Sequence, residues 1–180
     1  GKSISHGTAA LEYDLAKEID GQTAAIEIAR HELYGCTGAE MVQEMKPYHA
    51  DFPNVKNNCL RFEVSPSIEE SATFTDADWA ELGNDFMQRM GLANHQYIII
   101  RHSGTESKKE QAHLHILANR VSLSGELYRD NWIGKKATEA ANAIAKERNF
   151  VQSQDIGKAN KAEIKEAMDG VLKKMQGFDF

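Results

Sequence analysis

The chain has 180 residues, of which 41% are hydrophobic, so it is long enough to bury one good core and short for two. Its formal net charge of -6 excludes a strong overall basic field, so a nucleic-acid partner would need a local basic groove. Two distant cysteines do not make a disulfide scaffold, and no apolar run approaches the roughly 20 residues of a membrane span. We therefore expect one mixed α and β domain over residues 1–180.

The first part of the chain favours helices. Helix-forming residues fill 8–18 and 23–33, and Thr8 and Thr23 stand where helix N-caps are expected. A third helix is predicted over 38–46, before a polar loop that contains two prolines.

The middle of the chain changes to a strand pattern and then back to a helix. Residues 59–65 alternate between apolar and polar side chains, which predicts a half-buried strand. Thr75 followed by Asp78 is a variant of the capping box. It opens a predicted helix that runs to about Met90 and is closed by Gly91.

Two more strands and two more helices complete the chain. Residues 96–102 read QYIIIRH, a nearly continuous apolar run that is typical of a strand inside a sheet. A second strand is predicted over 112–121, with the sequence AHLHILANRV, and helices over 134–149 and 160–176. This succession of elements predicts an α/β (α+β) domain.

Three histidines of the two last strands form a candidate metal site. His113 and His115 are two residues apart in a strand, so their side chains project from the same face. His102 ends the preceding strand and approaches them if the two strands pair antiparallel. Three imidazoles leave coordination positions open, as a catalytic site needs. A His-x-His pair alone is also common among ordinary surface or core residues, so the third histidine carries the inference.

The segment from Asn58 to Asn131 resembles the relaxase/mobilisation nuclease family, the MobP-like branch of the HUH endonucleases. The resemblance rests on LRFEVSPS, TDADWAEL, YIIIRH and AHLHILANRV in this order, and on HGTAALEYDL near the start. It implies a central antiparallel sheet flanked by helices, with His102, His113 and His115 as metal ligands. It also implies that Asn119 closes the histidine motif and that Tyr13 is the nucleophile.

Four other residues are candidates for supporting the site or binding the substrate. Members of the family often carry an acidic residue where this chain has Gly104, and Glu106 in the following loop is the candidate for that role. Glu63 would either orient a histidine or form an exposed cross-strand salt bridge. By strand parity Asn119 shares the face of the paired histidines, and Arg120 is one of the few basic residues nearby.

The resemblance implies a DNA relaxase that nicks one strand at an origin of transfer and becomes attached to DNA through a 5'-phosphotyrosine. Such an enzyme mobilises a plasmid or transposon, binds single-stranded DNA, and works with accessory mobilisation and coupling proteins. It would be the N-terminal, catalytic part of a longer cytoplasmic bacterial protein. Imidazole ligands suit Mn, Zn, Ni or Co, with Mg less favoured, so the ion is not determined.

Two other functions compete with this interpretation. A rolling-circle replication initiator or single-tyrosine transposase also has paired histidines and a tyrosine, but its tyrosine usually follows the histidines. A non-catalytic binding module could use the histidines to hold a structural ion, although such sites are usually closed by a fourth protein ligand. Tyr34, near the end of the second predicted helix, competes with Tyr13 as nucleophile, whereas Tyr97 is expected to pack in the sheet.

Overall fold

The computed structural model describes residues 1–104, 111–151, 161 and 164–168, and divides into two compact units, Gly1–Ala141 and Asn142–Phe180. The candidate site lies in the first unit. The elements are β1 (Lys2–Ile4), α1 (Gly7–Leu15), β2 (Glu18–Ile19), β3 (Gln22–Thr23), β4 (Ala25–His31), α2 (Gly38–Met45), the 3-10 turn η1 (Lys46–His49), β5 (Cys59–Val64), α3 (Ile68–Ser71), α4 (Asp76–Arg89), β6 (His95–His102), β7 (His113–Ser122) and α5 (Ile133–Glu147).

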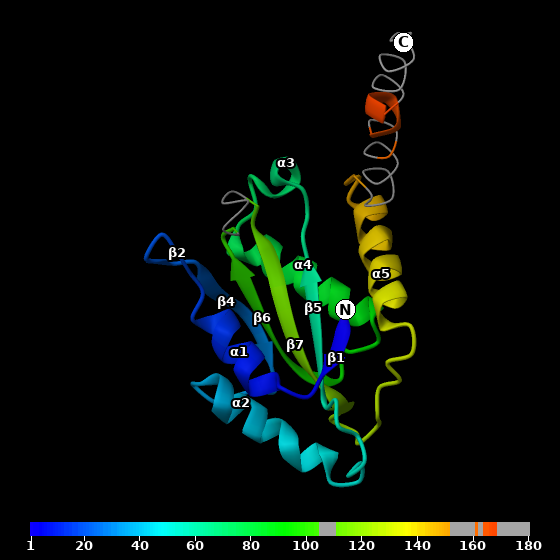
Figure 1. Cartoon of the computed structure of the whole chain (residues 1–180). Coiled ribbons are helices and arrows are strands. Elements are labelled where there is room, and N and C mark those ends of the chain that lie inside the picture. Colours follow the sequence, from blue (N-terminus) through cyan, green and yellow to red (C-terminus); the bar gives the residue numbers. More distant parts are fainter. Residues whose placement is uncertain (105–110, 152–160, 162–163, 169–180) are drawn as a thin grey trace, which may run out of the picture. The chain divides into compact units, whose positions relative to one another are not determined.

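The core of the fold is a five-stranded antiparallel sheet with the strand order β1-β5-β7-β6-β4 (Figure 1). The expected antiparallel sheet flanked by helices is therefore confirmed. The central strand is β7, which pairs with β5 on one side and with β6 on the other. In the β6–β7 pair His102 lies opposite His113, and Ile100 lies opposite His115.

Helices cover both faces of this sheet, with α1 and α2 on one face and α4 on the other (Figure 1). On the first face the buried side chains of α1 and α2 pack in one cluster with Ile98, Ile100 and Leu117. On the second face the rings of Phe62 and Phe86 pack edge to face with their centroids 5.4 Å apart. Burial on both faces explains why β6 and β7 read as nearly continuous apolar runs.

Local signals determine where α4 begins and ends. The Thr75 hydroxyl accepts the amide proton of Asp78, and the Asp78 carboxylate accepts the amide proton of Thr75, so the predicted capping box is confirmed. The chain leaves the helix through Gly91, whose φ of 71° favours glycine. In α1 the prediction over 8–18 was wrong at both ends, because the N-cap is His6 and not Thr8, and the helix stops at Leu15, before Glu18 enters β2.

The helix predicted over 23–33 is wrong. Residues Ala25–His31 form the edge strand β4, which pairs antiparallel with β6, and Thr23 belongs to β3 instead of capping a helix. The segment contains alanine and glutamate, which favour helices, but pairing with β6 outweighs this weak local preference.

The predicted strands over 59–65, 96–102 and 112–121 and the helices over 38–46 and 134–149 are confirmed to within two residues at each end. Most of the helix predicted over 160–176 lies outside the described residues. None of the helices within the described part of the chain is long and apolar enough to cross a membrane.

Candidate metal centre and nucleophile

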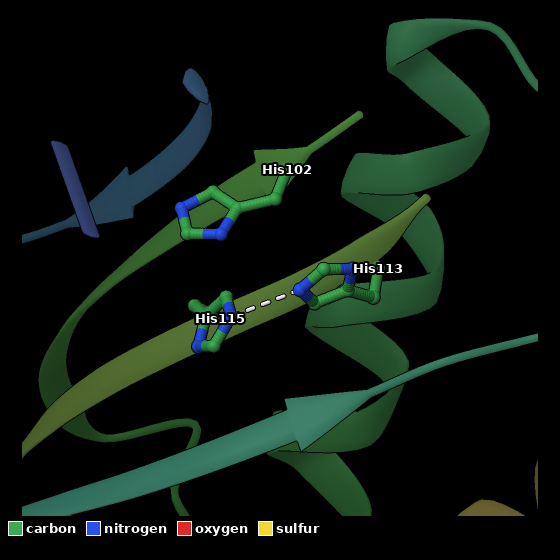
Figure 2. Close-up of side chains that lie close together, drawn as sticks. All are labelled: His102, His113 and His115. Carbon is green, nitrogen blue, oxygen red and sulfur yellow. Dashed lines mark hydrogen bonds between the residues drawn. The ribbon is translucent and has the colours of Figure 1, made fainter. Parts of the chain in front are cut away.

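The side chains of His102, His113 and His115 meet at one end of the β6–β7 pair (Figure 2). Each offers a ring nitrogen, and these three nitrogens all lie within 4.8 Å of one another. The fold produces this arrangement in two steps. Residues two apart on β7 face the same way, and the antiparallel register places His102 directly opposite His113. The sequence-based expectation that the three imidazoles gather is thus met in the structure.

Hydrogen bonds to backbone carbonyls decide which ring nitrogens remain available. His102 donates from Nε2 to the carbonyl oxygen of Asp14 at 2.7 Å, and His113 donates from Nδ1 to the carbonyl oxygen of Gln111 at 3.1 Å. The lone pairs of His102 Nδ1 and His113 Nε2 are therefore left for another partner. Figure 2 shows one nitrogen of the His102 ring directed toward the other two rings.

The third imidazole completes the cluster. His115 Nε2 lies 3.0 Å from His113 Nε2. When two nitrogens bind one ion, each metal–nitrogen distance is about 2.1 Å. For nitrogen–metal–nitrogen angles between a right angle and the tetrahedral angle, the two nitrogens then lie about 3.0–3.4 Å apart. The spacing of this pair therefore fits a shared cation, and an imidazole donor set fits a divalent transition metal.

The electrostatic surroundings keep two of these rings neutral. Burial, helped by the charges of neighbouring histidines and by Arg61 and Lys17, lowers the pKa of His115 to about 3. Burial also lowers the pKa of His102, against the raising effect of its bond to the Asp14 carbonyl. Because only a neutral imidazole has a lone pair for a metal, both side chains could bind an ion near neutral pH.

A buried ion pair supports the cluster from the side of α1. Asp14 is 1% exposed, and Arg61 of β5 donates to both of its carboxylate oxygens. Arg61 Nη2 also lies 3.2 Å from His115 Nδ1, and the nearer Asp14 oxygen lies 3.7 Å from the same nitrogen. Because a guanidinium can only donate, His115 Nδ1 is the acceptor in the contact with Arg61. Binding of an ion through Nε2 would move the ring proton to Nδ1, and Arg61 would then have to turn away so that this proton could approach the Asp14 carboxylate.

Neither Asp14 nor Arg61 was singled out from the sequence as a functional residue. The available signal was an aspartate three residues after the buried Leu11, on the side of α1 that faces the sheet. Burial with strong desolvation raises the pKa of Asp14, although Arg61 acts in the opposite direction. A perturbed carboxylate beside a histidine cluster is typical of a functional site.

Tyr13 precedes Asp14 on α1, and its side chain is 59% exposed. Its hydroxyl accepts a hydrogen bond from Lys17 Nζ at 3.3 Å. A tyrosine that must attack a phosphate needs such access and a cation near its oxygen. The structure therefore leaves Tyr13 available for chemistry, next to a residue that contacts the histidine cluster.

The competing tyrosine has the opposite surroundings. The Tyr34 hydroxyl donates to a carboxylate oxygen of Glu32 at 3.1 Å, and this bond together with the negative charge raises the pKa of Tyr34. A phenolate is disfavoured beside a carboxylate. Tyr97 is 7% exposed and its hydroxyl donates to Asn84, which agrees with the predicted packing role.

Glu63 lies near the cluster. It is directly opposite His115 in the β5–β7 register, it is exposed, and it lines a surface pocket together with Arg61 and His115. The carboxylate thus stands beside the paired histidine at the mouth of the site. Glu106, the other acidic candidate, lies outside the described residues.

Asn119 and Arg120 lie farther along β7. Asn119 follows His115 by four residues, which corresponds to about 13 Å along a strand. Its buried amide donates to Met45 and Gln96 and accepts from Val121, so these bonds hold the fold together.

Arg120 is likewise bound within the fold. It pairs with Asp130 at 2.7 Å and donates to two backbone carbonyls, those of Tyr128 and Asn57. The structure brings the three histidines and Glu63 together and leaves Asn119 and Arg120 in separate hydrogen-bond networks.

The comparison with protein families agrees with this site. Residues 13–150 match the family model described as relaxase, MobA/VirD2-like, nuclease domain, and the matched region starts at Tyr13 and contains all three histidines. No curated protein and no solved structure shows significant similarity to the chain. The match spans well over half of the 180 residues, and relaxase nuclease domains nick DNA and bind its single-stranded form. The chain belongs to the MobA/VirD2-like relaxase family and contains its DNA-nicking nuclease domain.

Proposed function

We propose that this relaxase nicks one strand at an origin of transfer by a metal-dependent transesterification with Tyr13 as the nucleophile. The observation that carries the proposal is a hydrogen bond between the backbone of α1 and one histidine of the cluster. The carbonyl of Asp14, the residue after Tyr13, accepts a hydrogen bond from His102 at 2.7 Å. One short helix therefore carries the phenol and touches a metal ligand.

His102, His113 and His115 are the residues that would hold the divalent ion, and Mn, Mg, Zn, Ni and Co remain open. When bound, such an ion supplies Lewis-acid stabilisation of the charge on the phosphate and on the leaving oxygen. The chain itself orients the ligands, because backbone carbonyls fix the tautomers of two histidines. Glu63 and the Asp14–Arg61 pair are proposed to support the third.

The bonds exchanged in the reaction are as follows. The phenol of Tyr13 releases its proton to solvent, its Oη forms a bond to the scissile phosphorus, and the bond from phosphorus to the 3' oxygen breaks. The 3' oxygen takes up a proton from solvent, so a 3'-hydroxyl and a 5'-phosphotyrosine result. One phosphodiester replaces another, and the step is therefore reversible.

The biological setting that we propose is the mobilisation of a plasmid or transposon in a bacterial cytoplasm. The substrate is single-stranded DNA at the nick site, which permits access to unstacked bases. Accessory mobilisation and coupling proteins are proposed as partners of a longer protein of which these residues form the catalytic part.

A covalent-adduct assay tests this function. The purified protein is incubated with Mn²⁺ and a random-sequence pool of single-stranded DNA labelled at the 3' end, and is then resolved in denaturant. A 5'-phosphotyrosine keeps the 3' part of the DNA, so the label should move with the protein, whereas a 5' label should leave as a free fragment. Chelation with EDTA should abolish the adduct.

The matched variants are Tyr13→Phe and Tyr34→Phe. We expect Tyr13→Phe to form no adduct and Tyr34→Phe to act as the wild type. Tyr13 precedes the residue whose carbonyl contacts His102, whereas the Tyr34 hydroxyl is bound to Glu32. An adduct that persists in Tyr13→Phe would favour the rolling-circle or transposase alternative. Tight metal binding with no adduct from any pool would favour the non-catalytic binding module.

A further inference from the structure

Lys17 occupies a defined place beside the histidine cluster, although nothing in the sequence patterns drew attention to it. It follows the end of α1, and its carbonyl oxygen accepts a hydrogen bond from the amide of Ala24 at 2.9 Å. The carbonyl of Ala24 in turn accepts from the amide of Ser103 at 2.9 Å. Because Ser103 directly follows His102, two backbone bonds connect Lys17 to the strand end that carries a metal ligand.

The side chain of Lys17 turns back over α1 toward the nucleophile. Its ammonium nitrogen lies 3.3 Å from the Tyr13 hydroxyl oxygen and 5.5 Å from the centroid of the same ring. Lys17 lies just beyond the end of α1, so its side chain reaches back to Tyr13 in the last turn of the helix. Lys17 is only partly exposed, whereas Tyr13 is mostly exposed. The phenol oxygen is thus held between a cation and solvent.

The charge of Lys17 also reaches the metal ligands. It contributes to the lowered pKa of His102 and to that of His115, in each case after burial, which is the largest cause. The ammonium is therefore near enough to act on both the phenol and the histidine cluster. An ammonium has three N–H donors, and within the described part of the chain the Tyr13 hydroxyl is the acceptor seen for one of them, so the ammonium can also donate to an anionic ligand.

We propose that Lys17 is a catalytic residue of the nicking reaction, whose ammonium donates a hydrogen bond to the phenolate oxygen of Tyr13 and to a non-bridging oxygen of the scissile phosphate in single-stranded DNA. This inference rests on the proposed function, in which Tyr13 is the nucleophile. In this role Lys17 donates hydrogen bonds only and transfers no proton. The phenol proton goes to solvent, and the leaving 3' oxygen is protonated by solvent.

The chemical need for such a group is clear. An unperturbed phenol has a pKa of about 10, so only about one in a thousand is ionised at pH 7. A cation fixed at the oxygen favours the anion, and a preorganised donor directed at developing charge is worth about 10²–10³ in rate in other enzymes. The hydroxyl of Tyr34, by contrast, lies next to the carboxylate of Glu32. An exposed tyrosine of this chain therefore does not always have a cation at its oxygen.

The test compares Lys17→Gln, Lys17→Arg and the control Lys135→Gln, which removes an ammonium that is 72% exposed and pairs with Glu139 at 3.8 Å. The readout is the single-turnover rate of adduct formation with saturating 3'-labelled single-stranded DNA and Mn²⁺. Manganese affinity and DNA affinity are measured separately by titration. Retained manganese binding shows that each variant has folded around its histidines.

For Lys17→Gln we expect the rate at saturating DNA to fall about 100-fold, with manganese affinity within about threefold of wild type. Lys17→Arg should recover most of the rate because it restores a cationic donor, and Lys135→Gln should match the wild type. A rate for Lys17→Gln within threefold of wild type overturns the inference. A defect that disappears at saturating DNA also overturns it, because the role would then be binding alone.

A second measurement separates an action on the phenolate from a structural effect. Replacement of Tyr13 by a ring-fluorinated tyrosine makes the phenol more acidic without changing Lys17. In the Lys17→Gln background this replacement should raise the rate at least tenfold, and in the wild type it should raise it much less. Equal effects in both backgrounds would refute an action of Lys17 on the phenolate.

The controls also distinguish the two levels of inference. If the wild type forms no adduct, or if Tyr13→Phe still forms one, the proposed function fails and the role of Lys17 fails with it. If the wild type and Tyr13→Phe behave as expected and Lys17→Gln is fully active, only the inference about Lys17 is wrong.

Discussion

Replacing Arg61 by methionine should destabilise the fold strongly at neutral pH and much less in acid. Arg61 is the partner of Asp14, whose side chain is only 2% exposed. Methionine fills a similar volume without charge, so the carboxylate is left buried without its cation. The decrease in stability therefore measures the cost of keeping the Asp14 carboxylate buried without a cation. A chelator in the sample excludes any contribution from metal binding.

The magnitude follows from the burial of the pair. Removing one member of a buried ion pair costs about 3–5 kcal/mol. Arg61 is 21% exposed, so we expect a value near the lower end, about 3 kcal/mol. For a domain of this size, each kcal/mol lowers the melting temperature by about 2–4 °C, so a decrease of about 6–12 °C is expected.

The pH dependence has a definite sign. Burial already holds the folded-state pKa of Asp14 above its ordinary value, and loss of Arg61 raises it further. A carboxyl with a raised folded-state pKa destabilises the fold above that pKa, and this penalty disappears on acidification toward the unfolded value. The loss of stability in Arg61→Met should therefore shrink by about 1.4 kcal/mol per pH unit between the folded-state pKa of Asp14 in the variant and its lower folded-state pKa in the wild type.

The assay is urea unfolding in EDTA at pH 7.5 and pH 4.5, with Arg101→Met as control. Arg101 pairs with Asp76 at 2.8 Å, but Asp76 is 66% exposed, so that variant should lose less than about 1 kcal/mol at both pH values. Equal losses for Arg61→Met at the two pH values would refute this account of Asp14 and Arg61.

Three other outcomes are expected. A divalent ion at 100 times its dissociation constant should add about 2.7 kcal/mol to the free energy of unfolding, seen as a rise in melting temperature. His113→Ala should abolish this stabilisation and His6→Ala should retain it; equal stabilisation of both variants by Mn²⁺ would exclude His113 as a ligand. Burial lowers the pKa of His115 to about 3, so between this value and about pH 6.5 the unfolded chain binds more protons than the folded one. The free energy of unfolding in EDTA should therefore decrease on acidification by up to about 1.4 kcal/mol per pH unit. In His115→Phe the decrease should be less steep. Thr75→Ala removes the capping oxygen of α4 and should cost about 1 kcal/mol in urea unfolding, while an unchanged midpoint would show that the capping box adds nothing.

The histidine cluster could be predicted from the sequence because its geometry depends on short-range rules. Alternation along β7 places His113 and His115 on one face, and the antiparallel pairing with β6 brings His102 opposite them. The capping box at Thr75 is also local, and it predicted the start of α4 correctly.

The parts that sequence reasoning missed depend on contacts between distant residues. The strand Ala25–His31 pairs with β6, whose residues lie about 70 positions later, and its own composition favours a helix. Asp14 and Arg61 are 47 residues apart, so no pattern in either segment identifies the pair. Lys17 is different, because its spacing of four from Tyr13 is local and a search for such pairs along α1 would have found it.

The bond between the Asp14 carbonyl and His102 has a mechanical consequence. A rotation of α1 that swung the phenol away would also pull on an imidazole of the cluster, so the two halves of the proposed reaction centre cannot separate freely. In the proposed cycle the attached DNA end would consequently stay beside the three histidines that would hold the ion while the other end departs. Rejoining then requires only that a 3'-hydroxyl return, because Tyr13 and the histidines are still next to one another for the reverse reaction.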